Sequence, residues 1–388
     1  MDIEEIKVKD EKHLIKTCLI FIISIIIIFV IARYISNDKF RSSINRNVFK
    51  SETSEELLNS IDVDNDNNIN IYAYDKYIVV FSKNILSQYL ANGNLDSKTE
   101  ISISVPIMDS KGEYFVIAEK NGHKIALLSG KNTLWERDIE GDISRVSVNN
   151  KGYVSVIIKN TAYKSKVIVF DDKGNDLFTV FLQSNYAICS DISDNNKYLA
   201  IGEVTYSGTM LKSMVVVYST EKAQTDPNNA IINSYDAKEG RLIVDINYHG
   251  NDNAICRFDS YVEKVKKDSN TTIYENTDTD IFIDSNLEKS VAIVNRSDNE
   301  IFNYEYQLDF IDIVGKGERL YILNQDVPNF LIANKKLVAV NLGREVDFIN
   351  SSGYLKKKYF SNNTVNSVVL GDSIAGIVYK NKIVIVKL

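Results

Sequence analysis

The chain has 388 residues, of which 44% are hydrophobic and 25% charged, and its net charge is -7 at pH 7. This composition is typical of a globular protein and excludes a disordered one. Residues 1–35 carry equal numbers of acidic and basic side chains, so the negative excess belongs to residues 36–388. An acidic body without a basic stripe argues against nucleic acid as a partner.

The first strong feature along the chain is an uncharged apolar run, TCLIFIISIIIIFVIA at Thr17–Ala32. With Lys16 and Arg33 at the lipid–water interface, residues 14–35 supply about the twenty residues that a membrane-spanning helix needs. A cleaved signal peptide is the alternative, but it would have a shorter apolar region followed by a small-residue cleavage site. Since Arg33 and Tyr34 follow instead, we predict one transmembrane helix.

The orientation of this helix is predicted from what flanks it. Four lysines precede the apolar run and five basic residues follow it closely, so the positive-inside rule gives nearly equal weight to both sides. A short amino-terminal tail before a large folded domain favours a cytoplasmic tail over residues 1–13. The carboxyl-terminal domain is then expected on the outer side of the cell membrane.

Residues 36–67 are polar and lack a strand pattern, which predicts a stalk or linker. Its sharpest motif is Asp62, Asp64 and Asp66, a spacing of carboxylates that imitates a calcium-binding loop. Two departures weaken the match: Asn67 replaces the turn glycine, and Ala73 occupies the position of the closing carboxylate. A solvated linker is the alternative interpretation of this motif.

The best-formed unit of the chain follows at residues 143–182. It contains four short runs rich in β-branched and aromatic residues, ISRVSV, YVSVIIK, SKVIVF and DLFTVFL, separated by Asn, Asp, Lys and Gly turns. Such a pattern predicts a four-stranded antiparallel meander. One such sheet cannot cover both of its faces alone, so we expect copies that pack on one another.

The same unit recurs along residues 68–388. Its second strand starts at eight places, spaced 37 to 56 residues apart: Tyr77, Tyr114, Tyr153, Tyr198, Ala254, Val291, Leu337 and Ile374. This spacing predicts an all-β fold, a β-propeller with eight blades favoured and seven possible. The last copy has only three strands, so a strand from Ile69 to Tyr74 either completes it or belongs to the first blade.

Cysteine and tryptophan usage indicates packing and not chemistry. Cys18 lies in the apolar run, whereas Cys189 and Cys256 lie in strand-like runs and are predicted to be buried free thiols, with a disulfide as the alternative. The single tryptophan, Trp135, falls in a fourth-strand position, where packing between blades is the ordinary role. The three histidines are isolated and predicted at the surface: His13, His123 and His249.

No catalytic motif of the common kinds is present, so we predict no catalytic residue, no cofactor and no enzyme activity. Candidate partner-binding residues are aromatic side chains in the less regular copies: Tyr206, Phe302, Tyr304 and Tyr306. The last three alternate with polar residues, so they form either one face of a strand or an aromatic patch for a partner.

The layout of short tail, single span, stalk and repeats such as GKNTLWERDIEG and DDKGNDLFTVFL resembles an uncharacterised family of single-pass membrane proteins of Gram-positive bacteria. That family carries an extracytoplasmic propeller similar to WD40 and quinoprotein-like propellers, although the scarcity of tryptophan departs from the quinoprotein pattern. Because a propeller presents many loops from a rigid ring, we expect a protein-interaction scaffold at the cell envelope, bound to an unidentified envelope protein or peptide. The alternatives are a glycan- or calcium-binding sensor and, third, an envelope enzyme.

Overall fold

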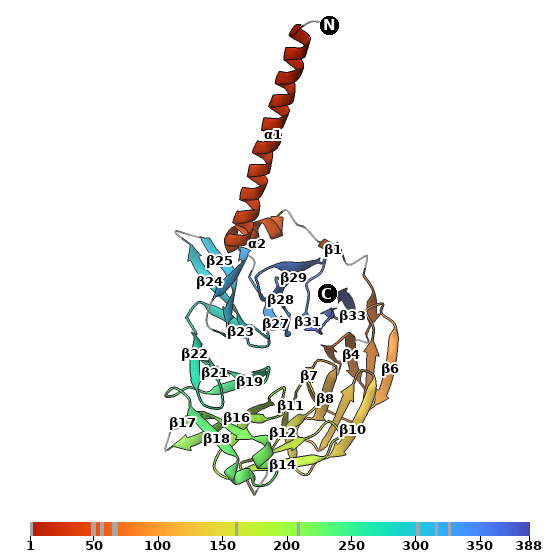
Figure 1. Cartoon of the computed structure of the whole chain (residues 1–388). Helices are drawn as coiled ribbons and strands as arrows, with labels where there is room; N and C mark the ends of the chain where they lie inside the picture. Colours follow the sequence, from red (N-terminus) through yellow and green to blue (C-terminus); the bar gives the residue numbers. More distant parts are fainter. Residues whose placement is uncertain are drawn as a thin grey trace.

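The computed structural model describes residues 3–47, 52–54, 58–63, 69–159, 162–207, 210–299, 303–314, 317–324 and 327–388. It is an eight-bladed β-propeller preceded by a long apolar helix (Figure 1). The predicted fold class and the favoured blade number are confirmed. In each blade the first strand lies nearest the central axis and the later strands follow outwards (Figure 1).

The first four blades are continuous in sequence. Blade 1 contains β3 (Asn70–Tyr74), β4 (Tyr77–Ser82), β5 (Ile85–Tyr89) and β6 (Leu95–Glu100). Blade 2 contains β7 (Pro106–Lys111), β8 (Tyr114–Glu119), β9 (Lys124–Ser129) and β10 (Asn132–Asp138). Blade 3 contains β11 (Asp142–Val148), β12 (Val154–Lys159), β13 (Ser165–Phe170) and β14 (Asp176–Leu182). Blade 4 contains β15 (Tyr186–Ile192), β16 (Tyr198–Ser207), β17 (Met210–Ser219) and β18 (Ile231–Asp236), with the short helices α3 (Thr220–Ala223) and η2 (Pro227–Asn229) before β18.

The remaining blades follow the same order. Blade 5 contains β19 (Ile243–His249), β20 (Asn253–Phe258), β21 (Tyr261–Val265) and β22 (Asn270–Glu275). Blade 6 contains β23 (Asp280–Asp284), β24 (Ser290–Asn299), β25 (Asn303–Asp312) and β26 (Glu318–Asn324). Blade 7 contains β27 (Phe330–Ala333), β28 (Leu337–Asn341), β29 (Glu345–Asn350) and β30 (Leu355–Phe360). The carboxyl-terminal strands of blade 8 are β31 (Ser367–Leu370), β32 (Ile374–Val378) and β33 (Lys382–Lys387).

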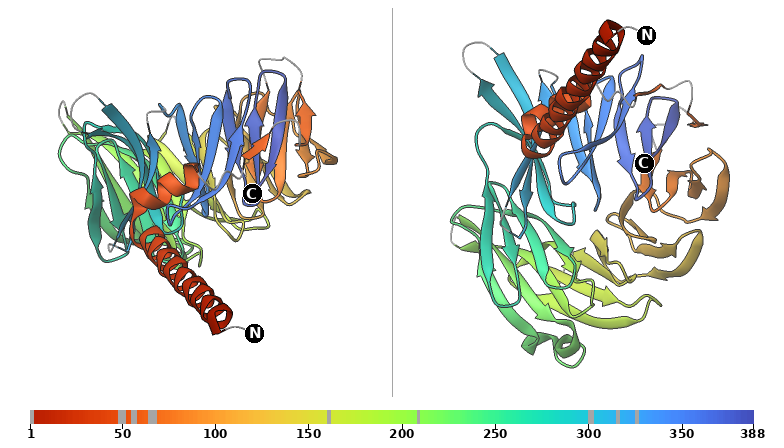
Figure 2. Two further views of the ribbon diagram at one scale, coloured as in Figure 1. Left: turned by 90° about the horizontal axis from the view of Figure 1, so that it is seen from above. Right: turned by 45° about the horizontal axis from the view of Figure 1, so that its top comes forward.

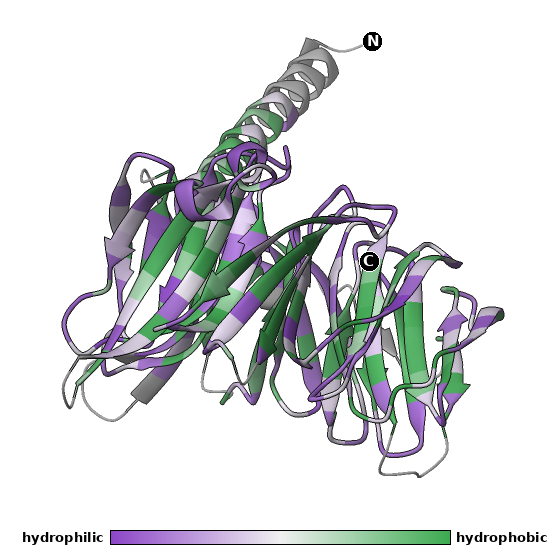
Figure 3. Ribbon diagram, turned by 90° about the horizontal axis from the view of Figure 1, so that it is seen from below, coloured by the Kyte–Doolittle hydropathy of each residue, from purple (hydrophilic) through white to green (hydrophobic). Residues whose placement is uncertain are grey.

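The core lies between blades, because each sheet presents an apolar face to its neighbour while the turns stay hydrophilic (Figure 3). Trp135 of blade 2 packs against Phe170 of blade 3 with ring centroids 5.6 Å apart, which confirms its predicted role. Gly174 has φ +80° and lies so close to the indole that an added Cβ would come within 2.8 Å of it. Cys189 and Cys256 are buried free thiols in the core of blades 4 and 5, also as predicted.

Blade 8 is completed by the strand β2 (Ser60–Asp62), which pairs with β33 as the outermost strand. Ile61 faces Ile383 across this pair, and its side chain is only 4% exposed. The stretch Ile69 to Tyr74 contributes β3, the innermost strand of blade 1, and not the closing strand. The two ends of the propeller sequence therefore meet in one sheet.

The amino-terminal helix α1 (Ile3–Ser36) continues into α2 (Asp38–Asn47) and then into β1 (Glu52–Ser54), which pairs in parallel with β30. The segment Lys16–Ser36 is long and apolar enough to cross a membrane, and none of its side chains is buried. Within residues 36–67, where a stalk was expected, β1 and β2 pair with strands of the propeller and α2 packs against it. Sequence periodicity could not reveal this, since the two strands have three residues each.

The α1–α2 joint docks on blades 6 and 7 through Arg41, whose side chain is fully buried. Arg41 Nη2 donates to Asp38 Oδ1 at 2.6 Å and to the Ser352 carbonyl at 3.4 Å, and the guanidinium lies 4.5 Å from the centre of the Tyr354 ring. Asp38 Oδ2 in turn accepts the backbone N–H of Leu320 at 3.2 Å. A short, buried ion pair with a stacked guanidinium fixes the helix relative to the ring.

The two faces of the ring differ in what they carry. We call the end at which the first strand of each blade turns into the second the proximal face; the turn from the third strand to the fourth lies at the same end of each antiparallel blade. Arg41 contacts such a turn at Ser352, so the helix leaves from the proximal side (Figure 2). The distal face carries the hairpin tips of β16–β17 and β24–β25.

Candidate functional site in the central channel

A cavity of about 600 Å³ occupies the central channel towards the proximal face. All eight blades line it, chiefly with the last residues of their first strands and with the turns that follow, for example Asp75, Lys111, Asp191, His249 and Lys335. This volume falls within the range of pockets that hold a small molecule or an inserted side chain. The channel is therefore the strongest candidate for a binding site in the described residues.

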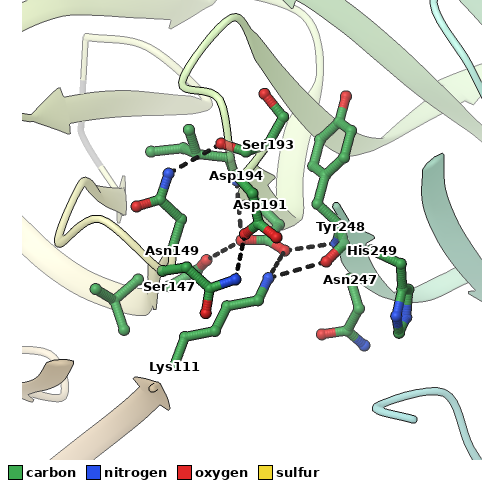
Figure 4. A network of polar contacts seen from close by, with 12 residues as sticks. Lys111, Ser147, Asn149, Asp191, Ser193, Asp194, Asn247, Tyr248 and His249 are labelled. Carbon is green, nitrogen blue, oxygen red and sulfur yellow. Dashed lines mark hydrogen bonds and ion pairs between the residues drawn. The ribbon is translucent and has the colours of Figure 1, made fainter. Parts of the chain in front are cut away.

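Asp191 is the centre of a polar network in the wall of this cavity (Figure 4). Its carboxylate accepts from Ser147 Oγ at 2.7 Å, from the Tyr248 backbone N–H at 2.7 Å and from Lys111 Nζ at 3.1 Å. Lys111 Nζ also donates to the Tyr248 carbonyl at 3.0 Å. Side chains of blades 2, 3 and 4 thus meet the backbone of blade 5, which rigidifies this half of the ring.

The charge of Lys111 is maintained inside this network. Burial acts to lower its pKa, but the carboxylates of Asp191 and Asp194 outweigh burial and raise the pKa above its ordinary value. The ammonium group therefore stays protonated at neutral pH and is matched by Asp191. Such a buried, hydrogen-bonded pair orders the wall of the cavity, although it is no measure of net stability.

The Asp191 contact belongs to a repeated pattern. In blades 2, 4 and 6 an aspartate near the end of the first strand accepts a backbone N–H from the first strand of the next blade. The three contacts are Asp109 to Val148 at 2.8 Å, Asp191 to Tyr248 at 2.7 Å and Asp284 to Ala333 at 3.0 Å. Burial raises the pKa of Asp109 and of Asp284 to about 6 each. These carboxylates satisfy backbone donors that the channel would otherwise leave without a partner.

His249 contradicts the expected surface position of the histidines. It is buried at the end of β19, and its Nε2 lies 2.8 Å from the Ser285 carbonyl of blade 6. Burial, reinforced by the charge of Lys111, lowers its pKa to about 4, so the imidazole is neutral at pH 7. Its sequence neighbours are polar turn residues, and these concealed the packing between blades. His123 is exposed, as predicted.

The lining is acidic overall. Three cationic side chains line the cavity, and each has a partner: Lys111 binds Asp191, Arg145 binds Asp245, and Lys335 donates to Asn150 Oδ1. Burial, followed by repulsion from Lys111, lowers the pKa of Lys335. Against these stand seven carboxylates, those of Asp75, Asp109, Asp191, Asp194, Asp245, Glu288 and Asp372. A cationic ligand is therefore favoured over an anionic one.

Of the candidate site residues predicted from the sequence, those that the structure describes do not line the channel cavity. Asp62 is exposed on β2, whereas Asp64 and Asp66 fall outside the described residues. Within the part of the chain that the structure describes, no group of three or more His, Cys, Asp or Glu side chains is arranged to hold a metal ion.

The two predicted aromatic residues whose side chains the structure describes, Tyr206 and Tyr306, lie on different blades. Tyr206 is 66% exposed at the distal tip of blade 4. Tyr304 and Tyr306 lie on β25 of blade 6, where Tyr306 is partly buried against the core shared with blade 7. Tyr306 thus fits the interpretation as a strand face, while Phe302 lies outside the described residues. The channel network was missed, although an aspartate before a polar turn recurs at Asp109, Asp191 and Asp284.

The sequence profile of DUF5711, a family of unknown function, matches residues 48–388. The chain belongs to this family. The match begins before β1, so the DUF5711 region includes the two short strands that join the ring ahead of blade 1. No curated protein matches the chain.

Solved structures similar to this DUF5711 chain are propellers of low sequence identity. The crystal structure of BamB from Moraxella catarrhalis has a TM-score of 0.51 at 12% identity, covering 85% of this chain and 99% of that one. The carboxyl-terminal WD40 domain of Sif2 has a TM-score of 0.56 at 10% identity, covering 85% and 98%. Chaetomium thermophilum Sqt1, bound to the N-terminus of the ribosomal protein L10, has a TM-score of 0.52 at 12% identity, covering 85% and 100%. At these identities the likeness concerns the fold.

Proposed function

We propose that this protein is a membrane-anchored propeller that serves as a protein-interaction scaffold on the outer side of the cell membrane. The observation that carries the proposal is the docked α1–α2 joint. An exposed apolar helix of membrane-spanning length is held by the buried Arg41 against a closed ring. The arrangement fits a platform held at a set orientation to a bilayer.

The ring itself suits recognition better than a chemical reaction. Its channel and hairpin tips are presented by rigid sheets, a common arrangement for binding loops. Propellers similar in fold include Sqt1, which is bound to the N-terminus of another protein. That precedent supports a protein or peptide as the partner here. Of the two aromatic candidates whose side chains the structure describes, Tyr206 and Tyr306, the more exposed is Tyr206, at 66% on the distal face.

Cross-linking in intact cells tests the proposal. Cells that express the full chain with a tag after Leu388 are treated with a membrane-impermeant amine-reactive cross-linker, and the tagged chain is recovered. We expect the propeller lysines to react and a defined envelope protein to be enriched. Modification only after the cells are permeabilised would contradict the orientation, and recovery of the chain alone would contradict the scaffold role.

A matched pair of variants tests the distal candidate in the same experiment. Tyr206→Ser removes the exposed aromatic at the tip of blade 4. Leu134→Ser changes a side chain of comparable character, 44% exposed, on the outer strand of blade 2. If Tyr206 contacts the partner, its variant reduces recovery several-fold while the Leu134 variant does not. Equal recovery from both would remove Tyr206 from the candidates.

A further inference from the structure

We propose that the channel cavity binds an ammonium or guanidinium group, presented by a lysine or arginine side chain of a peptide that enters from the proximal face. This deepens the proposed function, and it rests on that function only in taking the ligand to be part of a protein partner. The membrane anchor is not needed for it, because the cavity is formed entirely by the ring.

The first support is the cavity itself. Its volume of about 600 Å³ is ample for one long side chain with its hydration, and all eight blades contribute to its wall. The contacts from Asp191 to Ser147, Lys111 and Tyr248 hold part of that wall in place before a ligand arrives. A preformed polar wall lowers the entropic cost of binding.

The second support is the distribution of free charge. The cationic side chains in the wall already have partners, as described above. In the lining, the carboxylates of Glu288 and Asp372 form no hydrogen bond or ion pair with another described residue, although the charge of Lys335 acts on both, and Asp75 lies close to Asp372. Burial raises the pKa of Asp75; the positive charge of Lys76 acts to lower it, and the negative charge of Asp372 raises it further, so the pKa lies above its ordinary value. An incoming cation would relieve this repulsion.

The third support concerns the kind of cation. No cluster of metal-ligating side chains exists in the described part of the channel, so a dedicated metal site is not formed there. Guanidinium and ammonium groups instead pair with single carboxylates. Glu288 and Asp372 are two such carboxylates, on different blades. A free polyamine shares this chemistry and is distinguished from a peptide by experiment.

Binding is measured with the full chain in lipid nanodiscs, using a fluorescent Gly-Ser peptide that carries two lysines. The matched probes are the same peptide with acetylated lysines and the same peptide with glutamates. We expect the lysine peptide to bind and its affinity to fall steeply with added salt. We expect the acetylated and glutamate peptides to bind at least tenfold more weakly. Equal binding of the acetylated peptide would overturn the proposal.

Variants locate the site. Glu288→Gln combined with Asp372→Asn removes both free carboxylates while keeping their size and surface position. Glu136→Gln combined with Asp138→Asn, two exposed changes on the outer strand of blade 2, is the charge-matched control. We expect the double variant to lose at least tenfold in affinity and the control to stay within twofold, with melting temperatures unchanged. An unchanged affinity in the double variant would overturn the assignment to the channel.

Spermidine separates the two sources of the cation. If a peptide is the ligand, spermidine displaces the labelled lysine peptide only at concentrations well above the dissociation constant of that peptide. If spermidine binds tightly with the same dependence on Glu288 and Asp372 while the peptide binds weakly, the peptide part of the proposal is overturned. These results are independent of the cross-linking test, since a scaffold that binds its partner at the distal face would fail here and pass there.

Discussion

Blade 3 and blade 8 have the same architecture but reach it by different routes. Blade 3 is built from one continuous stretch, residues 142–182, with short turns between its strands. Blade 8 takes three strands from the carboxyl terminus and its outer strand, β2, from residues 60–62. Pairing Ile61 with Ile383 closes a loop of almost the whole domain, whereas blade 3 closes only short loops.

This difference shows where local pattern suffices and where it does not. The runs of β-branched residues in blade 3 specify its strands directly. The three-residue strand β2 has one buried apolar side chain, Ile61, and its place is specified by the gap that blade 8 leaves. The ring therefore depends on a segment that carries almost no secondary-structure signal of its own.

The largest expected effect tests that dependence. Ile61→Ala should lower the free energy of unfolding by roughly 2–5 kcal/mol, because it leaves a cavity in the closing sheet. Val180→Ala in the outer strand of blade 3, which is 4% exposed like Ile61, gives the local comparison. Urea unfolding of the full chain in detergent measures both. A loss below about 0.5 kcal/mol for Ile61→Ala would mean that β2 does not hold blade 8.

The contact between blades 5 and 6 gives the contrasting case. Each of these blades is built from one continuous stretch of sequence, and the buried imidazole of His249 joins them. The pKa of His249 is about 4 in the fold and about 6.5 in the unfolded chain, so its stabilising effect is present above pH 6.5 and is lost as pH falls through 4. Titration of His249 should lower the free energy of unfolding by roughly 2 kcal/mol at pH 5 relative to pH 8.

The variant His249→Gln isolates this effect, because glutamine can still donate to the Ser285 carbonyl but does not titrate. Asp109 and Asp284, whose pKa values are raised to about 6, act in the opposite sense and are common to both proteins. We therefore expect the variant to lose less stability than the parent between pH 8 and pH 5, while the exposed control His123→Gln follows the parent. Parallel pH profiles for parent and variant would refute the buried, neutral His249.

A smaller effect is expected where blade 8 packs on blade 1. A Cβ at Gly376 would lie 2.9 Å from Val369, 3.0 Å from Ile383 and 3.1 Å from Cδ1 of Ile78. Gly376→Ala should therefore destabilise the ring by about 1–3 kcal/mol through overpacking. Ile78→Val removes one of these three obstructing atoms, the one contributed by blade 1, so the double variant should recover part of that loss in a double-mutant cycle. Strict additivity of the two changes in unfolding free energy would argue against close packing between blades 8 and 1.

The smallest effect on unfolding is expected at the helix joint. Arg41→Met retains volume but loses the bond to Asp38 and the stacking on Tyr354, so α2 should loosen while the ring remains folded. Spin labels on α1 and on blade 7 should give a broader distance distribution in the variant than in the parent. Lys39→Met, an exposed change two residues earlier in the same helix, serves as the control. An unchanged distribution in Arg41→Met would show that the joint does not depend on this contact.

Much of the ring could be predicted from the sequence, because the runs of β-branched and aromatic residues that form the strands recur in each blade. The eight predicted second-strand starts lie within one residue of the observed strands, and Trp135 packs between blades as expected. The two short strands that join blades 7 and 8 could not be predicted, since neither β1 nor β2 is long enough to show an alternation of apolar and polar residues. The docking of α2 depends on one buried arginine, Arg41, which in the sequence is an ordinary charge after an apolar run.

The channel site was hidden for a different reason. Lys111 and Asp191 are far apart in sequence, and only the circular arrangement brings them together. His249 likewise became buried through a neighbour on the next blade, Ser285. Side chains that face a shared axis give no periodic signal along the chain. The sequence therefore predicted the propeller fold but not the cavity in its channel.

Hydrogen exchange of the full chain in lipid nanodiscs tests most directly the claim that the segment after the apolar helix is part of the ring. The peptide that covers residues 58–63 should be protected to a degree similar to β14 of blade 3, and Ile61→Ala should remove that protection. Complete exchange of residues 58–63 in the unmodified chain within seconds, at the rate of a free linker, would contradict the account.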